Sequence, residues 1–178
     1  VPGNVELDLI RADLLPEDLY KDENVRLTEQ FERYEWWYET TFTMPKTQGK
    51  TYLYFEGVDC LAEYWLDGVY MGESDNMLIP FKLEVPHPVE GETYQLRVRL
   101  RSVVLEADKY RFDMLTVVHD WNQRIIESLP IRKARHTYGW DIMPRIVSAG
   151  IWKDVYVLSE TAYDFSQCAY FTESVCEE

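Results

Sequence analysis

Alternation of apolar and polar side chains with a period of two restricts the fold of this sequence more than any other feature. The clearest run is 94–101, in which four apolar residues alternate with one glutamine and three arginines. Successive side chains of a β-strand point to opposite faces of a sheet, so this run predicts a strand with one buried face. Weaker alternation or short apolar runs predict further strands at 36–45, 51–55, 60–66, 69–71, 81–85 and 151–158.

Turn residues separate these runs at intervals typical of an all-β domain. Asp67 and Gly68 stand between two of the runs and predict a two-residue hairpin, because a type I′ turn needs positive φ at both central positions. Seven or so short strands joined in this way predict an all-β fold, and specifically a β-sandwich of the jelly-roll type.

The N-terminal segment, residues 4–20, departs from the period of two. Its apolar residues recur at helical spacing and predict a short N-terminal helix or turn that Pro16 stops. The residues on this expected apolar face are Leu7, Ile10, Leu14 and Leu15.

A second interruption spans residues 102–130. Apolar residues again recur at helical spacing, with charged residues between them, and predict a helical insertion around 115–129 that ends at Pro130. The apolar positions are Val117, Val118, Trp121, Ile125, Ile126 and Leu129.

The charge of the chain is acidic overall and uneven along its length. The net charge is −14 and the pI is about 4.6, so the chain repels phosphate backbones and nucleic acid is not an expected partner. No run approaches the ~18 apolar residues of a membrane span, so no membrane partner is expected either. Residues 97–153 hold 11 basic and 6 acidic residues. This segment either faces an acidic partner domain or neutralises the rest of its own fold, and the second interpretation is favoured.

Common signatures of enzyme chemistry are absent from the sequence. It has no nucleophile elbow, no HExxH zinc motif, no P-loop and no dinucleotide fingerprint. The three cysteines form no CxxC pair, and Cys60 lies in an alternating apolar run where we expect a small core residue. We therefore predict no metal site and no cofactor, and the sequence alone singles out no catalytic residue among its 32 carboxylates. A structural Ca²⁺ would be best held by the oxygens of three loop residues, Asp67, Asp75 and Asn76. We do not predict such a site.

Aromatic residues make up 15% of the chain, a composition that favours strands and also suits surfaces that contact sugars. Trp36 and Trp37 are adjacent in one predicted strand, so their side chains point to opposite faces. We expect one of them in the core and the other exposed or covered by a neighbouring domain.

Three stretches of the chain resemble the sugar-binding N-terminal domain of glycoside hydrolase family 2. The second resembles the entry segment of its β-mannosidase branch, and the third is similar to a signature of that branch. The first is YFEGVDCLAEYWLDG, residues 54–68, which continues to Pro80 and Phe81. The second is VPG, residues 1–3, followed by DLIRADLLP, residues 8–16. The third is RKARHTYGWDIMPR, residues 132–145, followed by AGIWKDV, residues 149–155. The family usually has Trp-Gly where this chain has Ile142 and Met143, which alters the shape and the aromatic surface of that loop.

The resemblance implies a galactose-binding-domain-like β-sandwich over residues 1–160. Residues 161–178 would be a linker and the start of a following immunoglobulin-like domain. The partners so implied are the rest of the same polypeptide, with its immunoglobulin-like and TIM-barrel domains, and a β-linked sugar or oligosaccharide. The catalytic glutamates of the family lie on the barrel, so the chain itself is expected to be non-catalytic. The expected compartment is periplasmic, secreted or lysosomal in type rather than cytoplasmic.

The resemblance also implies substrate-binding residues in the third stretch. Asp141 would accept hydrogen bonds from two sugar hydroxyls, and Trp140 would supply an apolar wall of the terminal-sugar pocket. Arg135 and His136 would support them. In a purely structural alternative, Trp140 belongs to the core, Asp141 caps a turn, and Arg132, Lys133 and Arg135 form a solvated or interdomain face.

Three functions remain open at this point. The chain is a pocket-edge module of a β-mannosidase-like exo-glycosidase, a free-standing carbohydrate-binding module, or a purely structural interdomain sandwich. A free-standing module predicts sugar affinity in the isolated chain and, ideally, an exposed trio of aromatic residues. A structural domain predicts no sugar binding and an apolar patch for the missing domains to cover.

Overall fold

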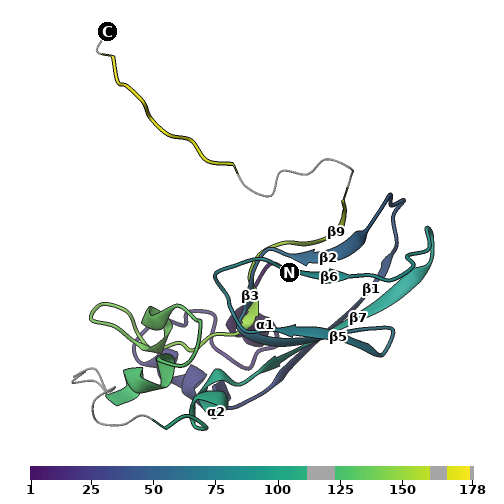
Figure 1. The fold of residues 1–178 in the computed structure, drawn as a ribbon. Helices are drawn as coiled ribbons and strands as arrows, with labels where there is room; N and C mark the ends of the chain where they lie inside the picture. The colour runs from purple at the N-terminus through teal and green to yellow at the C-terminus, as the bar shows by residue number, and fades with distance from the viewer. Residues whose placement is uncertain (112–122, 161–167, 177–178) are drawn as a thin grey trace.

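The computed structural model describes residues 1–111, 123–160 and 168–176, and the fold is a sandwich of antiparallel sheets (Figure 1). One sheet has four strands in the order β1-β7-β4-β5, and a second has three in the order β6-β2-β9. A two-stranded sheet pairs β3 with β8. The strands are β1 (Trp36–Thr43), β2 (Thr51–Phe55), β3 (Val58–Asp59), β4 (Leu61–Leu66), β5 (Val69–Ser74), β6 (Phe81–Glu84), β7 (Thr93–Arg101), β8 (Gly150–Ile151) and β9 (Val155–Ser159).

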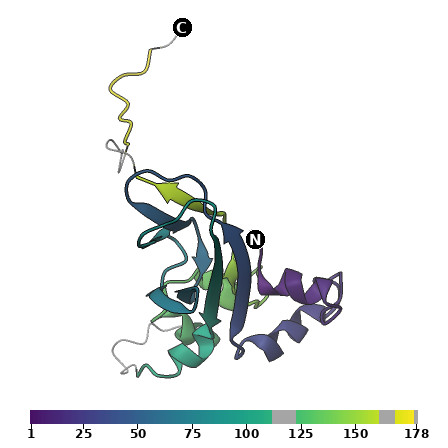
Figure 2. The same cartoon turned by 90° about the vertical axis from the view of Figure 1, so that its right-hand side faces the viewer.

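Short helices cover one end and one side of this sandwich. They are α1 (Val5–Arg11), η1 (Asn24–Phe31), α2 (Val103–Ala107), η2 (Gln123–Ser128) and η3 (Arg135–Tyr138). The segments α2, η2 and η3 gather at one end, which we call the loop end (Figure 1). Figure 2 shows α1 and η1 beside each other on one side of the sheets. No helix in the described part of the chain is long and apolar enough to cross a membrane.

The main core lies between the sheets, as the alternation predicts. The apolar face of β7 is directed into it through Leu96, Val98 and Leu100, while Arg97 and Arg99 lie on the opposite face. The other fully buried core residues are Met44, Leu53, Phe55, Val58, Ala62, Tyr64, Leu66, Leu83, Val85 and Ile151.

Several local predictions are confirmed. The Asp67–Gly68 hairpin joins β4 to β5, with φ of 48° and 80° at its two central residues. Cys60 is buried, and its burial raises the pKa of the thiol to about 12. Trp36 packs against the core, whereas the side chain of Trp37 is exposed.

The predicted strand 151–158 is divided in two. Gly150 and Ile151 form β8 against β3, and the chain then returns to pair β9 with β2. Between the two strands, the Trp152 amide donates to the Gly57 carbonyl at 3.2 Å. The division therefore comes from a long-range contact with the loop that follows β2, which periodicity does not reveal.

The N-terminal helix exists, but two of the four residues on its predicted apolar face are exposed. The Asn4 side chain caps α1 by accepting from the Leu7 amide at 3.0 Å, and the helix ends at Arg11. The chain then turns through Asp13, whose φ is 58°, so spacing counted across that point is no longer helical. Leu14 is exposed as a result, whereas Leu7 is exposed because it lies on the outer face of α1. The buried apolar residues in this part of the chain are Val5, Leu9, Leu15 and Leu19.

The helical insertion predicted around 115–129 is described only in part, since 112–122 lie outside the described residues. The described portion is the 3₁₀ helix η2, which ends at Ser128 before a turn at Leu129 and Pro130. The helix η1 was not predicted from the sequence, and its segment carries only three apolar residues, Val25, Leu27 and Phe31. Residues 168–176, which follow the predicted boundary at 160, are exposed and contain no helix or strand.

Candidate functional site

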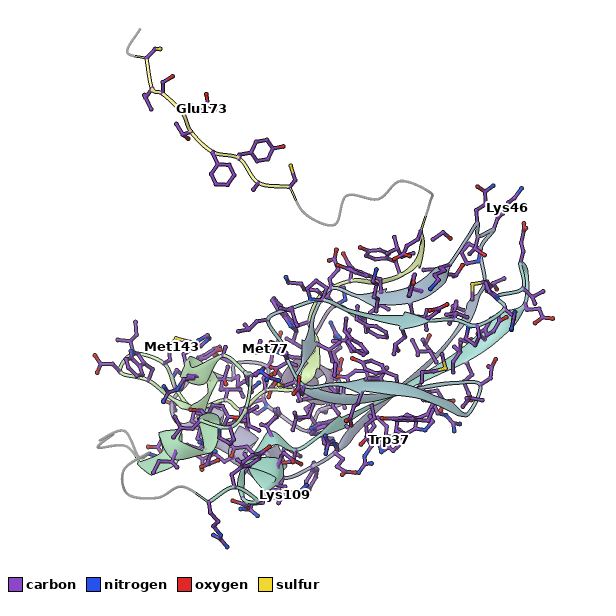
Figure 3. The ribbon with its side chains drawn as sticks, in the orientation of Figure 1. Trp37, Lys46, Met77, Lys109, Met143 and Glu173 are labelled. Carbon is purple, nitrogen blue, oxygen red and sulfur yellow. The ribbon has the colours of Figure 1, made fainter. Side chains whose placement is uncertain are left out.

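A short exposed loop projects from the loop end of the sandwich, and we call its residues 139–143 the tip loop. Gly139 follows η3 with a φ of 105°, a conformation that favours glycine and turns the chain outward. The Trp140 amide donates to the Met143 carbonyl at 3.0 Å, and the Met143 amide donates back to the Trp140 carbonyl at 3.2 Å. These two bonds close the loop on itself. Figure 3 shows Met143 at the end of the molecule opposite Lys46.

The tip loop presents apolar side chains and one carboxylate to solvent. Trp140 is 64% exposed, Ile142 is 87% exposed, and Asp141 lies exposed between them. No hydrogen bond or ion pair joins the Asp141 carboxylate to any other residue that the structure describes. A carboxylate placed in this way can accept hydrogen bonds from two ligand hydroxyls.

An arginine fixes the base of the tip loop from the side of η1. The Arg145 guanidinium donates to both carboxylate oxygens of Glu32, at 2.8 and 2.7 Å, and to Glu127 at 3.1 Å. It also donates to the Tyr138 carbonyl at 3.4 Å, just before the loop begins. Both Arg145 and Glu32 are largely removed from solvent, so the paired geometry is held firmly.

A buried polar network lies on the other side of the loop base, and we call it the base network. The Lys133 ammonium, whose side chain is 0% exposed, donates to the Asp59 carboxylate and to the Ser148 carbonyl. The Ser148 hydroxyl in turn donates to Glu6 in α1 at 2.5 Å. The network therefore links four segments that are distant in sequence.

Burial shifts the protonation of the acids in the base network. Burial raises the pKa of the Glu6 carboxyl, and the hydrogen bond from Ser148 only partly opposes this. Burial also raises the pKa of Asp59, with the Lys133 charge acting in the opposite direction. The Lys133 charge thus compensates a carboxylate that would be costly to bury alone.

The structure separates the four predicted substrate residues into two groups. Trp140 and Asp141 lie together on the tip loop. Arg135 and His136 are exposed on η3, where the Arg135 Nε donates to the Ser128 hydroxyl at 3.1 Å. His136 lines a cleft of about 380 Å³ between η3 and the N-terminal segment, with Met143 at its edge.

The structural alternative for the third stretch is wrong in three respects, the first being that the Asp141 carboxylate caps no turn within the described residues. Trp140 is exposed rather than part of the core, and Lys133 is buried rather than on a solvated face. Arg132 and Arg135 are exposed, as that alternative expected. Sequence reasoning missed the partners Glu6 and Glu32, which no motif marks, and it gave no role to Asp59, which lies in the first family stretch.

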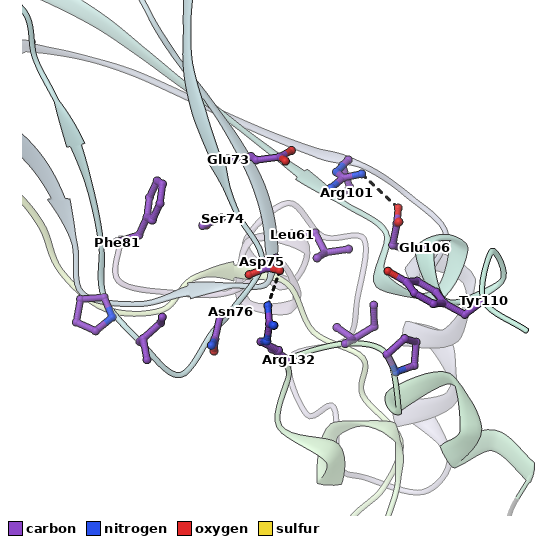
Figure 4. A pocket seen from close by; sticks show the side chains of 14 residues that line it. Leu61, Glu73, Ser74, Asp75, Asn76, Phe81, Arg101, Glu106, Tyr110 and Arg132 are labelled. Atoms are coloured by element: carbon purple, nitrogen blue, oxygen red, sulfur yellow. Dashed lines mark hydrogen bonds and ion pairs between the residues drawn. The ribbon is translucent and has the colours of Figure 1, made fainter. Parts of the chain in front are cut away.

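A second cleft, of about 440 Å³, lies between the loop after β5 and helix α2 (Figure 4). The Arg132 guanidinium donates to the Asp75 carboxylate at 2.6 Å within it, and Arg101 pairs with Glu106 at 3.2 Å. Tyr110 forms part of the wall. These charges are therefore already paired with one another.

The residues suggested for Ca²⁺ have protein partners instead. Asp67 accepts from the Gln95 amide at 2.7 Å, Asp75 pairs with Arg132, and Asn76 accepts from the Leu78 amide at 2.9 Å. Among the residues that the structure describes, no cluster of three His, Cys, Asp or Glu side chains could hold a metal ion.

The basic segment 97–153 neutralises acids of its own fold, as favoured above. Its ion pairs reach back to the acidic N-terminal half of the chain in at least five cases. These pairs are Arg97–Glu39, Arg99–Glu35, Arg132–Asp75, Lys133–Asp59 and Arg145–Glu32.

Comparison with known proteins gives one consistent result. The sequence model of the family described as "Glycosyl hydrolase 2 galactose-binding domain-like" matches residues 1–153. Beta-mannosidase B of Thermothelomyces thermophilus is 30% identical over 164 residues, which cover 88% of this chain and 18% of that protein. The beta-mannosidase of Mus musculus is 29% identical, over 97% of this chain and 20% of that protein.

A solved structure agrees with these sequence relatives. The crystal structure of Beta-D-Mannosidase from Dictyoglomus thermophilum superposes with a TM-score of 0.75 and 35% sequence identity. The match covers 89% of this chain and 20% of that one. The chain therefore spans about a fifth of the length of the relatives that it matches.

Proposed function

Because this chain belongs to glycoside hydrolase family 2, as a galactose-binding-like N-terminal domain of the β-mannosidase type, we propose that it acts as a non-catalytic pocket-edge module. In this proposal the tip loop reaches the mouth of a catalytic barrel in the same polypeptide. There it contributes Asp141 and Trp140 to the pocket for the terminal sugar of a β-mannoside.

The observation that carries the proposal is the contrast between the tip loop and its base. Trp140 and Ile142 are exposed apolar side chains that cost free energy in water and suit coverage by another domain or a sugar ring. Below them, Arg145 and Lys133 hold the loop base through buried ion pairs. A binding loop is expected to have a base that is held rigidly and a tip whose side chains are free to contact a ligand.

The chemistry of Asp141 fits binding rather than acid–base catalysis. Its carboxylate is exposed and lies beside no other carboxylate of the tip loop, so it can accept hydrogen bonds from two adjacent hydroxyls of a hexose. Trp140 beside it can contact the apolar face of the same sugar. A retaining glycosidase needs its two catalytic carboxyls about 5–5.5 Å apart, and in this proposal that pair lies on the barrel.

The test is kinetic and uses the complete polypeptide that carries this domain with its catalytic domain. Asp141→Ala is expected to lower kcat/KM on a β-mannoside by roughly a hundredfold or more, since each hydrogen bond to a charged group is worth about 1.5–3 kcal/mol. Asp141→Asn, which keeps one acceptor oxygen, is expected to fall between Asp141→Ala and the unmodified enzyme.

Glu90→Ala supplies the matched control. It removes an exposed carboxylate at the end of the sandwich opposite the tip loop and should leave kcat/KM unchanged. Near-normal activity of Asp141→Ala, with an unchanged melting temperature, would refute the role of the tip loop and favour a purely structural sandwich.

A further inference from the structure

Three aromatic side chains form a row across the outer face of the four-stranded sheet, and we call them the aromatic row. They are Trp37 on β1, Trp65 on β4 and Tyr70 on β5. The ring centres of Trp37 and Trp65 are 5.2 Å apart, and those of Trp65 and Tyr70 are 5.7 Å apart. Trp37 is 57% exposed and Tyr70 is 52% exposed. Figure 3 shows Trp37 on the side of the sheet that faces away from the second sheet.

Strand register explains why these rings meet. Trp37 is opposite Arg99 and Trp65 is opposite Arg97 on the central strand β7, so all four side chains share the outer face. The two indoles therefore approach each other above β7. The Arg99 guanidinium lies 5.9 Å from the Trp37 ring centre, and bonds to Glu35 and Glu63 hold it there.

Polar groups border the row on both sides. Near one side, Glu39 accepts from Gln95 and from Arg97, each at 2.7 Å. On the other, Arg99 bonds to Glu63 at 3.0 Å and to Glu35 at 2.5 Å. Three carboxylates face two guanidiniums in these groups, so the border of the row has a small excess of negative charge.

We propose that the aromatic row is a binding platform for a neutral oligosaccharide chain. The C–H face of a pyranose ring is apolar and stacks on an aromatic ring, while its hydroxyls point sideways to polar partners. The row supplies the rings, and Glu39, Gln95 and Arg97 supply donors and acceptors at its edge. The slight excess of carboxylates repels a polyanion and is compatible with a neutral glycan.

A protein partner fits this face less well. The exposed apolar strip is narrow, and a covering protein would have to remove the bordering ion pairs from water at a cost. Sugar hydroxyls can bond to the same groups without removing them from water. The platform is on the sheet face, whereas Asp141 is on the tip loop, so the two proposals are independent of each other.

The test titrates the 178-residue chain with mannohexaose, cellohexaose and, as the anionic comparison, a hexamer of galacturonic acid, by calorimetry and tryptophan fluorescence. Measurable binding of at least one neutral hexamer is expected, with weaker or no binding of the anionic one. Trp37→Ala and Tyr70→Ala should each weaken the affinity about tenfold or more, and Trp37→Phe should lose less.

The matched control removes an aromatic residue from the other sheet. Tyr156 on β9 is 42% exposed and pairs with Tyr54 at 5.1 Å, so Tyr156→Ala deletes a similar exposed ring and should bind as the unmodified chain does. Asp141→Ala should also retain this binding. Circular dichroism and melting temperature verify that each variant is folded.

Three outcomes would overturn the platform. The first is no binding of either neutral hexamer at millimolar concentration. The second is binding that Trp37→Ala and Tyr70→Ala leave unchanged. The third is self-association of the chain that Trp37→Ala abolishes in sedimentation experiments, without glycan binding, because the row would then be an interface between two copies.

Discussion

The Lys133 ammonium bonds to the Asp59 carboxylate inside the protein, although 74 positions separate the two residues. Asp59 ends β3, and Lys133 lies six residues before Gly139, where the tip loop begins. The pair therefore ties the support of an exposed loop to the edge of the sandwich core. Removing either charge would leave the other buried without a partner.

Lys133→Met should lower the free energy of unfolding by about 3–5 kcal/mol, because it strands the Asp59 carboxylate and leaves the Ser148 carbonyl without its donor. Urea denaturation measures the change. Lys50→Met is the control, since Lys50 and Glu84 form an exposed pair at 3.7 Å, and its effect should stay within about 1 kcal/mol. Equal effects of the two substitutions would contradict the buried pairing.

Glu6→Gln should change how stability depends on pH. Burial raises the folded-state pKa of Glu6 above its ordinary value of 4.5, so the folded protein binds this proton more tightly than the unfolded chain does. The stabilising contribution of Glu6 is fully present below pH 4.5 and is lost as pH rises through the folded-state pKa.

Glutamine cannot titrate but can still accept from Ser148. From pH 4 to pH 8, the stability of Glu6→Gln should therefore improve relative to that of the unmodified chain. Lys133 and Asp59, the charged groups that act on Glu6, are common to both proteins. The urea midpoints of both proteins at each pH test this prediction. It is refuted if the difference in stability between them stays constant with pH or changes in the opposite direction.

Arg145→Lys should destabilise the protein although it keeps the positive charge. Lysine cannot reproduce the two parallel bonds to Glu32, and the loss should be roughly 1.5–3 kcal/mol because this pair is mostly buried. Arg11→Lys, at an exposed single contact with Asp8, should cost less than about 0.5 kcal/mol. Thermal unfolding of both variants measures the difference. If Arg145→Lys left the stability unchanged, the two parallel bonds to Glu32 would be unimportant.

Gly150→Ala should be destabilising for a steric reason. A Cβ at this position would lie 2.5 Å from the Gly3 carbonyl oxygen and 2.7 Å from the Asn4 Cα, and both are backbone atoms that cannot rotate away. We expect a loss of about 1–3 kcal/mol. Gly3→Ala, where a Cβ would meet no atom within 4 Å, should change stability little. Chemical denaturation measures both variants. The same midpoint for the two would show that the backbone at Gly3 and Asn4 can move away from position 150, contrary to this prediction.

The strands could be predicted because their signal is local. Residues 94–101 alternate strictly, and a buried face on one side of a strand is sufficient to cause that pattern. The hairpin at Asp67 and Gly68 is equally local, since it depends on two adjacent residues that tolerate positive φ. The tip loop could be found only through a family resemblance, because Trp140 and Asp141 carry no pattern of their own.

The interior under the tip loop could not be predicted. From the sequence alone, Lys133 would be assigned to the surface. Its burial is tolerated only because Asp59 and Ser148 accept hydrogen bonds from its ammonium. The row of Trp37, Trp65 and Tyr70 also depends on the register of three strands with β7, which the sequence does not specify. The N-terminal helix was misassigned for a similar reason, because the turn at Asp13 resets the spacing that had suggested Leu14.

The two backbone bonds between Trp140 and Met143 have an evolutionary consequence. Because the tip loop closes through its own main chain, its exposed side chains contribute little to the stability of the sandwich. Substitutions at 140–142 therefore act on ligand contacts rather than on folding, because Lys133 and Arg145 keep the scaffold in place. The ligand contacts of the tip loop could therefore change without compensating mutations elsewhere in the sandwich.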